Sequence, residues 1–99
     1  MQLETMGGKS NRVIITILGR DQIGIIAWLT GRLAESSINV LDLSQTILQG
    51  FFTMIMIVDV SQSTVSLAEI TERLRSEGEE RGLKVNVRHE DIFAFMHRV

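Results

Sequence analysis

The chain has 99 residues, of which 44% are apolar and 22% charged, and its formal net charge is −2. This length fits one compact domain, which we expect over residues 12–90. Its Lys and Arg residues are scattered, which disfavours nucleic acid as a partner. With no cysteine and no run of about 18 apolar residues, we expect a cytoplasmic protein without a membrane span.

The N-terminal third predicts an arm, a strand and a helix. Residues 1–11 are polar and show no period, so we expect a mobile arm. Residues 13–18 form a nearly continuous aliphatic run, which is typical of a central strand. From Ile25 to residues 36–37 the period is helical, and the expected buried stripe is Ile26, Leu29 and Leu33.

Trp28 is the only tryptophan and is expected on the side of this helix away from the buried stripe. An exposed indole is a common anchor in protein interfaces, so Trp28 is a candidate contact for a partner. The alternative is that the ring lies flat over its own helix.

Two long strands joined by a tight turn are predicted next. Residues 38–48 alternate, with one face formed by Asn39, Leu41, Leu43, Gln45 and Ile47, and the other by Val40, Asp42, Ser44, Thr46 and Leu48. Gln49 and Gly50 provide a hairpin turn, because glycine readily adopts positive φ. Residues 51–60 should therefore return antiparallel to the preceding strand.

The C-terminal part predicts a helix, an edge strand and a last short helix. Ser66 and Glu69 have the spacing of a capping box, and Gly82 is a natural helix stop. Residues 83–88 alternate as a half-exposed strand does. Residues 91–99 form the expected helical extension, in which the apolar positions at helical spacing are Ile92, Phe95, Met96 and Val99. We treat Phe95 and Met96 as further candidate partner contacts.

This order of elements predicts the ferredoxin-like βαββαβ arrangement of the α+β class. Right-handed crossovers place both helices on one face of a four-stranded antiparallel sheet. Apolar residues on both sides of the segment 51–60 indicate that the other face is not fully solvated. We therefore expect the terminal helix or another subunit to cover part of it.

Residues 19–24, with the sequence GRDQIG, join the first strand to the first helix. Free N–H groups and the positive dipole at a helix N-terminus bind small carboxylates or phosphates. Asp21 either stabilises the helix start by itself or binds the ammonium group of a zwitterion. Gly24 either permits a tight turn or lets a ligand approach the backbone.

Three segments resemble the ACT domain family, the small ligand-sensing modules of amino-acid metabolism. They are the loop 19–24, the passage from helix to strand over residues 33–40, and the long hairpin 46–59. Among ACT proteins the chain is similar to the single-domain kind that includes the glycine cleavage system repressor. The family often has proline just before the loop glycine, where this chain has Ile23.

The resemblance implies a regulatory protein, not an enzyme, that binds a small amino acid without a cofactor where two domains meet. A homodimer or higher oligomer would change shape on binding and pass this state to a regulatory protein partner. The matching ligand-binding positions are Asp21, Gln22, Ile23, Gly24, Ile25, Asn39 and Val40. Asn39 is as readily explained as a turn residue that bonds its own backbone.

Other functions have weaker support in the sequence. A ligand-independent interaction module remains the main alternative. An acylphosphatase-like enzyme would use Arg20 in the first loop, but no second arginine or catalytic asparagine is evident, and we expect no catalytic residues. His89, Glu90, Asp91 and His97 carry metal-binding groups, but their spacing matches no common metal motif, so we expect no metal site.

Overall fold

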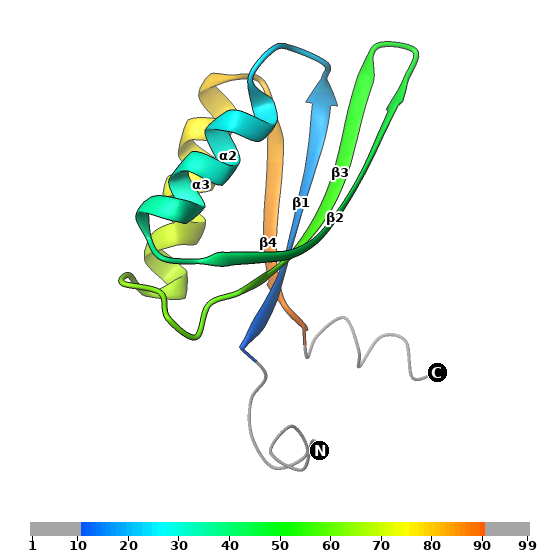
Figure 1. Cartoon of the computed structure of the whole chain (residues 1–99). Helices are drawn as coiled ribbons and strands as arrows, with labels where there is room; N and C mark the ends of the chain where they lie inside the picture. Colours follow the sequence, from blue (N-terminus) through cyan, green and yellow to red (C-terminus); the bar gives the residue numbers. More distant parts are fainter. Residues whose placement is uncertain (1–10, 91–99) are drawn as a thin grey trace.

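The computed structural model describes residues 11–90 (Figure 1). The elements follow the order β1 (Arg12–Arg20), α2 (Ile25–Glu35), β2 (Asn39–Leu48), β3 (Phe51–Asp59), α3 (Leu67–Glu80) and β4 (Lys84–His89). Of the predicted arm only Asn11 is described, and its carbonyl accepts a hydrogen bond of 2.9 Å from the amide of Val60. The predicted helical extension over residues 91–99, with Phe95 and Met96, lies outside the described residues.

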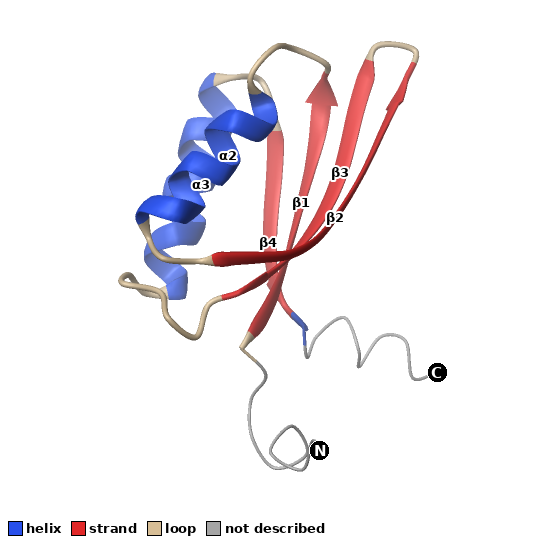
Figure 2. Ribbon diagram, in the orientation of Figure 1, coloured by secondary structure: helices blue, strands red, loops and turns tan. Residues whose placement is uncertain are grey.

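The four strands form one antiparallel sheet in the order β2-β3-β1-β4, and both helices cover the same face (Figure 2). The predicted α+β ferredoxin-like fold is therefore confirmed. The aliphatic β1 is central, as its sequence predicts, and β4 is an edge strand. Because β2 is the other edge, its outer side has no neighbouring strand within the described part of the chain.

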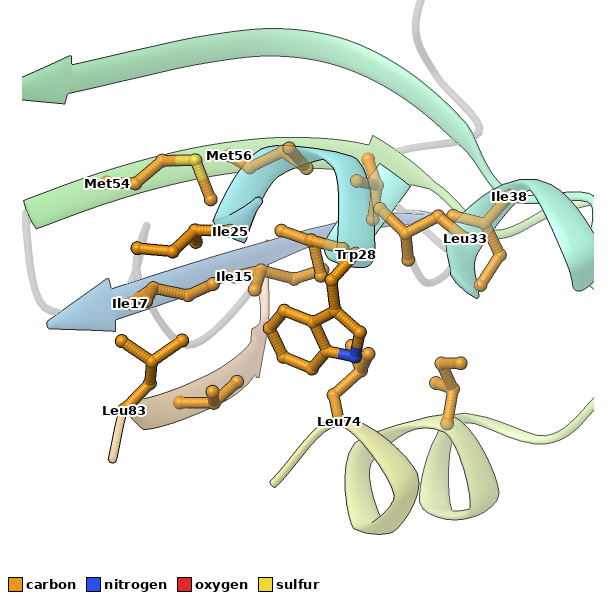
Figure 3. Close-up of a cluster of buried hydrophobic side chains, with 14 of the residues drawn as sticks. Ile15, Ile17, Ile25, Trp28, Leu33, Ile38, Met54, Met56, Leu74 and Leu83 are labelled. Atoms are coloured by element: carbon orange, nitrogen blue, oxygen red, sulfur yellow. The ribbon is translucent and has the colours of Figure 1, made fainter. Parts of the chain in front are cut away.

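The core lies between the sheet and the two helices (Figure 3). Alternate residues of β1 and β3 point into it, and they are Val13, Ile15, Ile17, Phe52, Met54, Met56 and Val58. Gly78 allows α3 to approach β4 closely, because a Cβ there would lie 2.5 Å from Cγ2 of Val85. This contact explains a glycine inside a helix, where it lowers intrinsic stability.

The helix boundaries follow local signals in the sequence. Oγ of Ser66 accepts a hydrogen bond of 3.1 Å from the amide of Glu69, so the Ser66 half of the predicted capping box forms. Gly82 has φ of 75° and ends α3, with the amide of Leu83 donating to the carbonyl of Gly78. Gln49 and Gly50 have φ of 53° and 84° and make the predicted hairpin turn.

Trp28 is buried, so the prediction that it lies on the exposed side of α2 is wrong. Its residue exposure is 8%, and the buried residues of α2 are Ile25, Trp28, Leu29 and Leu33, with Ile26 only partly buried. The physical reason is that α2 packs against α3 as well as the sheet, and Trp28 fills the space between the helices (Figure 3). Trp28 is therefore not available as an exposed partner contact.

The predicted alternation of β2 is also wrong on one point. A bulge between Val40 and Asp42 shifts the register, so Val40 and Leu43 both pack toward the core and Asn39 and Asp42 share the opposite face. One extra residue in a strand reverses every later position. The sequence pattern of β2 is mostly polar and does not mark where this reversal occurs.

Candidate functional site

The loop after β1 provides no side-chain cap for the N-terminus of α2. Gly24 is the N-cap residue, with φ of 92° and no side-chain capping hydrogen bond. Trp28 is the first helical residue whose amide bonds back, at 2.9 Å to the carbonyl of Gly24. Among the described residues, the amides of Ile25, Ile26 and Ala27 have no hydrogen-bond acceptor. These N–H groups and the helix dipole favour an anionic group at this position.

A groove of about 290 Å³ adjoins this helix terminus. One wall is formed by the loop and the first turn of α2, and the other by β2 and β3. Its lining residues are Asp21, Gln22, Gly24, Ile25, Ile26, Ala27, Gln45, Ile47 and Phe52. The groove therefore combines open backbone amides, one carboxylate and apolar walls, which is the composition of a site for a small polar ligand.

Gln45, Ile47 and Phe52 were not expected at the site from the sequence. Their positions could have been predicted from the hairpin, because its two-residue turn sets Leu48 opposite Phe51 and so fixes the register of the two strands. Phe51 pairs in turn with Arg20, the last residue of β1, which brings the hairpin beside the loop. The amide of Asp21 then donates to the carbonyl of Gly50 at 2.8 Å.

The predicted loop residues differ in what they offer a ligand. Asp21 is one of the residues that line the groove. Nε2 of Gln22 donates to the carbonyls of Arg81, at 3.0 Å, and Arg20, at 3.3 Å, so its amide group connects the loop to the end of α3. Ile23 is fully exposed and does not line the groove. Gln22 and Ile23 are thus less direct candidates for ligand contact than Asp21 and Gly24.

Asn39 and Val40 lie at the opposite end of the sheet from this loop. Asn39 pairs with Asp59, whereas Arg20 pairs with Phe51. Positions 51 and 59 are eight residues apart on β3, which corresponds to about 27 Å along an extended strand. A single chain therefore does not bring the two predicted halves of the site together.

A charged network lies beside the loop, between α2 and α3. Oε1 of Glu77 accepts hydrogen bonds from Nε1 of Trp28 and Nε of Arg32, both at 2.7 Å. The guanidinium of Arg81 stacks over the Trp28 ring at 4.7 Å from its centre. Hydrogen bonds from Trp28 and then Arg32 lower the pKa of Glu77. Because Gln22 donates to Arg81, this network also supports the loop.

Another groove, of about 500 Å³, lies along the edge formed by α3 and β4. Its charged lining residues are Arg75, Glu79 and Lys84, and Arg75 already pairs with Glu72 at 3.1 Å. None of the predicted ligand-binding residues lines it. The loop groove is therefore the better candidate site.

Residues 11–90 give no support to a metal site or to an acylphosphatase-like enzyme. Glu90 pairs with Arg12 at 3.4 Å, while Asp91 and His97 lie outside the described residues. Residues 11–90 contain no group of three or more metal-binding side chains. The guanidinium of Arg20 lies over the ring of Phe51, at 5.6 Å, and does not line the groove.

No helix in residues 11–90 has the length and hydrophobicity needed to cross a membrane.

The fold is a small α+β domain with a groove beside its first helix. A sequence profile described as ACT domain matches residues 11–88. A UPF0237 protein of Methanocaldococcus jannaschii is 46% identical over 89 residues, covering 90% of this chain and 99% of that protein. A UPF0237 protein of Listeria innocua is 42% identical over 88 residues, covering 89% of this chain and 99% of that one.

The solved structures agree with these relatives. An ACT domain protein from Streptococcus pneumoniae has a TM-score of 0.73 and 32% identity, covering 85% of this chain and 94% of that one. The chain belongs to the ACT domain family, and its relatives place it among the UPF0237 proteins.

The expected similarity to the glycine cleavage system repressor is distant. A structure titled a putative glycine cleavage system transcriptional repressor has a TM-score of 0.64 and 19% identity, with 78% of this chain and 44% of that one covered. At this identity the likeness shows a shared fold alone.

Proposed function

We propose that this ACT protein binds a small amino acid at a site shared between two copies and regulates a partner protein in response. The observation that carries the proposal is the uncapped start of α2, where three backbone amides have no acceptor among residues 11–90 and belong to residues that line the same groove as Asp21. Membership of the ACT family also supports the proposal, because resemblance to this family implies that an amino acid binds where two domains meet.

The groove supplies both charges that a zwitterion requires. The amides of Ile25 and Ile26 would donate to the ligand carboxylate at the positive end of the helix. Asp21 would accept hydrogen bonds from its ammonium group. Ile47 and Phe52 provide apolar walls, and Gln45 offers an amide to a polar side chain. These groups suit an amino acid with a small side chain.

A second copy is required if Asn39 contributes to the same site. In each copy the outer edge of β2 has no neighbouring strand among residues 11–90, so two copies can pair β2 against β2 in an antiparallel arrangement. The Asn39 end of one strand then lies against the Leu48 end of the other. In each copy the Leu48 end of β2 lies beside the loop of the same copy, because the amide of Asp21 donates to the carbonyl of Gly50 in the hairpin turn.

The effect of ligand binding would be transmitted through the arrangement of the two copies. A ligand that contacts the loop of one copy and β2 of the other favours the dimer arrangement in which both contacts form. The surface offered to a regulatory partner differs between the liganded and unliganded arrangements. Gln22 would couple the loop to α3 through its hydrogen bond to Arg81.

Thermal unfolding with each of the twenty amino acids tests the proposal. A ligand at 100 times its Kd contributes about 2.7 kcal/mol, which raises the midpoint by on the order of 10 °C in a domain of this size. We expect a selective shift that Asp21→Ala and Asn39→Ala abolish. Asn86→Ala, on the opposite edge strand, is the matched control and should keep the shift. No shift with any amino acid would contradict the proposal.

A ligand-independent interaction module is the second candidate. The observation in its favour is the exposed apolar surface near the hairpin, where Leu48 is 68% exposed and Leu18 and Phe51 are each 50% exposed. Such a surface is typical of an interface. This function requires no ligand, so the amino-acid screen separates the two candidates.

A further inference from the structure

The outer edge of β4 has no neighbouring strand among residues 11–90, and Figure 1 shows β4 on the side of the sheet away from β2. On its inner side β4 pairs with β1, from Lys84 opposite Leu18 to His89 opposite Val13. Alternate residues of an edge strand direct their N–H and C=O groups outward, away from the sheet. An extended chain can bind to these groups as an additional strand.

A groove of about 500 Å³ lies beside this edge. It is lined by Arg75 and Glu79 on α3 and by residues 82–86, which lead from α3 into β4. No lining residue comes from β1 or α2, so the groove lies on the outer side of β4. The side chains of an added strand that point toward α3 would therefore have space beside the edge.

The exposed side chains of β4 form a positive pattern. Lys84, Asn86 and Arg88 share the sheet face opposite the helices, because Val85 between them belongs to the core. Lys84 and Arg88 are exposed and form no ion pair within residues 11–90. On the helix side, Val87 is only partly buried against the core. The edge thus presents two cations on one face and an apolar side chain on the other.

The two cations oppose pairing of β4 with the same strand of a second copy. An antiparallel two-fold pairing centred on Asn86 would set Lys84 of each copy opposite Arg88 of the other. Like charges directly opposite each other destabilise a strand pair, whereas opposite charges stabilise it. Charged side chains protect edge strands from self-association, and they leave such an edge open to a segment of opposite charge. The charge pattern therefore favours an acidic occupant.

We propose that β4 binds an extended acidic segment of a partner protein, which adds to the four-stranded sheet as a further strand. Over five residues the segment would carry acidic side chains opposite Lys84 and Arg88 and a polar one opposite Asn86. The two residues between these would be apolar and lie on the α3 side, next to Val85 and Val87. The other edge strand, β2, contains no lysine or arginine and lacks this complementarity. The inference does not depend on amino-acid binding.

Two peptides of opposite charge test the proposal on the full chain. The acidic probe has the sequence Ser-Glu-Val-Thr-Val-Glu-Ser, the basic probe has lysine in place of glutamate, and both have blocked ends. Binding would be followed by fluorescence anisotropy of the labelled peptides at protein concentrations up to about 1 mM. We expect the acidic probe to bind about tenfold more tightly, because two cross-strand charge pairs differ in sign. No binding of the acidic probe, or equal binding of the two probes, would overturn the proposal.

Two charge reversals locate the binding on the protein. Arg88→Glu should weaken binding of the acidic probe about threefold or more and strengthen binding of the basic probe. Arg73→Glu is the matched control, because Arg73 pairs with Glu69 on α3 and does not line the groove, and it should leave both affinities nearly unchanged. Equal effects of the two reversals would mean that binding follows net charge and not β4. Thermal unfolding would verify that both variants fold.

Backbone methylation of the acidic probe tests strand addition itself. N-methyl groups on two residues whose N–H groups face β4 would remove hydrogen bonds to the edge and should weaken binding about tenfold. Two methyl groups on the alternate residues, whose N–H groups face away, should leave binding near that of the unmodified probe. Equal affinities of the two methylated peptides would contradict the addition of a strand to β4.

Discussion

Nε1 of Trp28 donates a hydrogen bond of 2.7 Å to Oε1 of Glu77, joining α2 to α3. The same oxygen accepts a bond of 2.7 Å from Nε of Arg32. Arg81 stacks over the indole ring, and its carbonyl accepts the hydrogen bond from Gln22 in the candidate ligand loop. The only tryptophan of the chain is thus part of a network that connects the helix pair to that loop.

Removal of the shared carboxylate should destabilise the fold. Glu77→Ala leaves the Trp28 N–H and the Arg32 guanidinium without this acceptor, so we expect a loss of about 2 kcal/mol in the free energy of unfolding. Urea unfolding monitored by Trp28 fluorescence measures this loss. Glu72→Ala is the control, since the Glu72 side chain is 73% exposed and pairs with Arg75 on the surface, and it should cost under about 0.5 kcal/mol. Equal losses would contradict the role assigned to the network.

The free energy of unfolding should decrease at acidic pH, partly because Glu77 becomes protonated. Its pKa is lowered from the ordinary value of 4.5, first by the hydrogen bond from Trp28 and then by that from Arg32. A group whose pKa is lower in the folded state stabilises the fold fully above its ordinary pKa and loses this contribution as the pH falls through the folded value.

The comparison of wild type with Glu77→Gln isolates this effect. The difference in the free energy of unfolding should be largest near neutral pH and shrink as the pH falls below the ordinary pKa of 4.5 and through the lower folded-state pKa of Glu77. Asp59, whose pKa is lowered by hydrogen bonds from Ser61, titrates in both proteins and cancels from the difference. A difference that stays constant with pH would show that the charge of Glu77 does not contribute.

Replacing Gly24 and Gly31 by alanine should change the stability of the protein in opposite directions. Gly24 has φ of 92°, so Gly24→Ala should destabilise the protein by roughly 1 kcal/mol. Gly31 lies inside α2, where alanine is the better helix former, and Gly31→Ala should stabilise by about 0.5–1 kcal/mol. A Cβ at either position has no neighbour within 4 Å, so packing does not obscure the comparison. Thermal unfolding measures both, and equal shifts would contradict the conformational explanation.

Gln22 should hold the loop in place without stabilising the whole fold strongly. Gln22→Ala removes the hydrogen bond to the Arg81 carbonyl, which we expect to be worth about 1 kcal/mol locally. Hydrogen exchange at the Asp21 amide, which bonds to Gly50, should become about fivefold faster. Amides in the central strand β1 serve as the internal control and should keep their rates. An unchanged rate at Asp21 would mean that the hairpin alone holds the loop.

Much of the fold could be predicted from the sequence because its signals are local. The Gln49 and Gly50 turn, the Ser66 cap and the Gly82 stop each depend on a few neighbouring residues. The bulge near Leu41 could not be predicted, because it depends on how β2 pairs with β3. Burial of Trp28 was also missed, since the helical period alone does not reveal that α2 has α3 as a second neighbour.

The candidate site was predictable in its loop and not in its surroundings. A glycine before a helical period identifies the open helix start at Gly24. The groove walls Gln45 and Phe52 come from strands distant in sequence, and only the sheet register brings them beside the loop. The separation of Asn39 from Asp21 likewise follows from the register, because each lies at an opposite end of the sheet.

Mixing of subunits tests the shared site most directly. Asp21→Ala and Asn39→Ala should each abolish binding of the amino acid found in the screen, when each variant is measured alone by calorimetry. After subunit exchange at equal concentrations, mixed dimers should hold one intact site each, which restores about a quarter of the wild-type sites. Restoration at that level would support a site built from the loop of one copy and β2 of the other. Verified mixed dimers that do not bind the amino acid would contradict it.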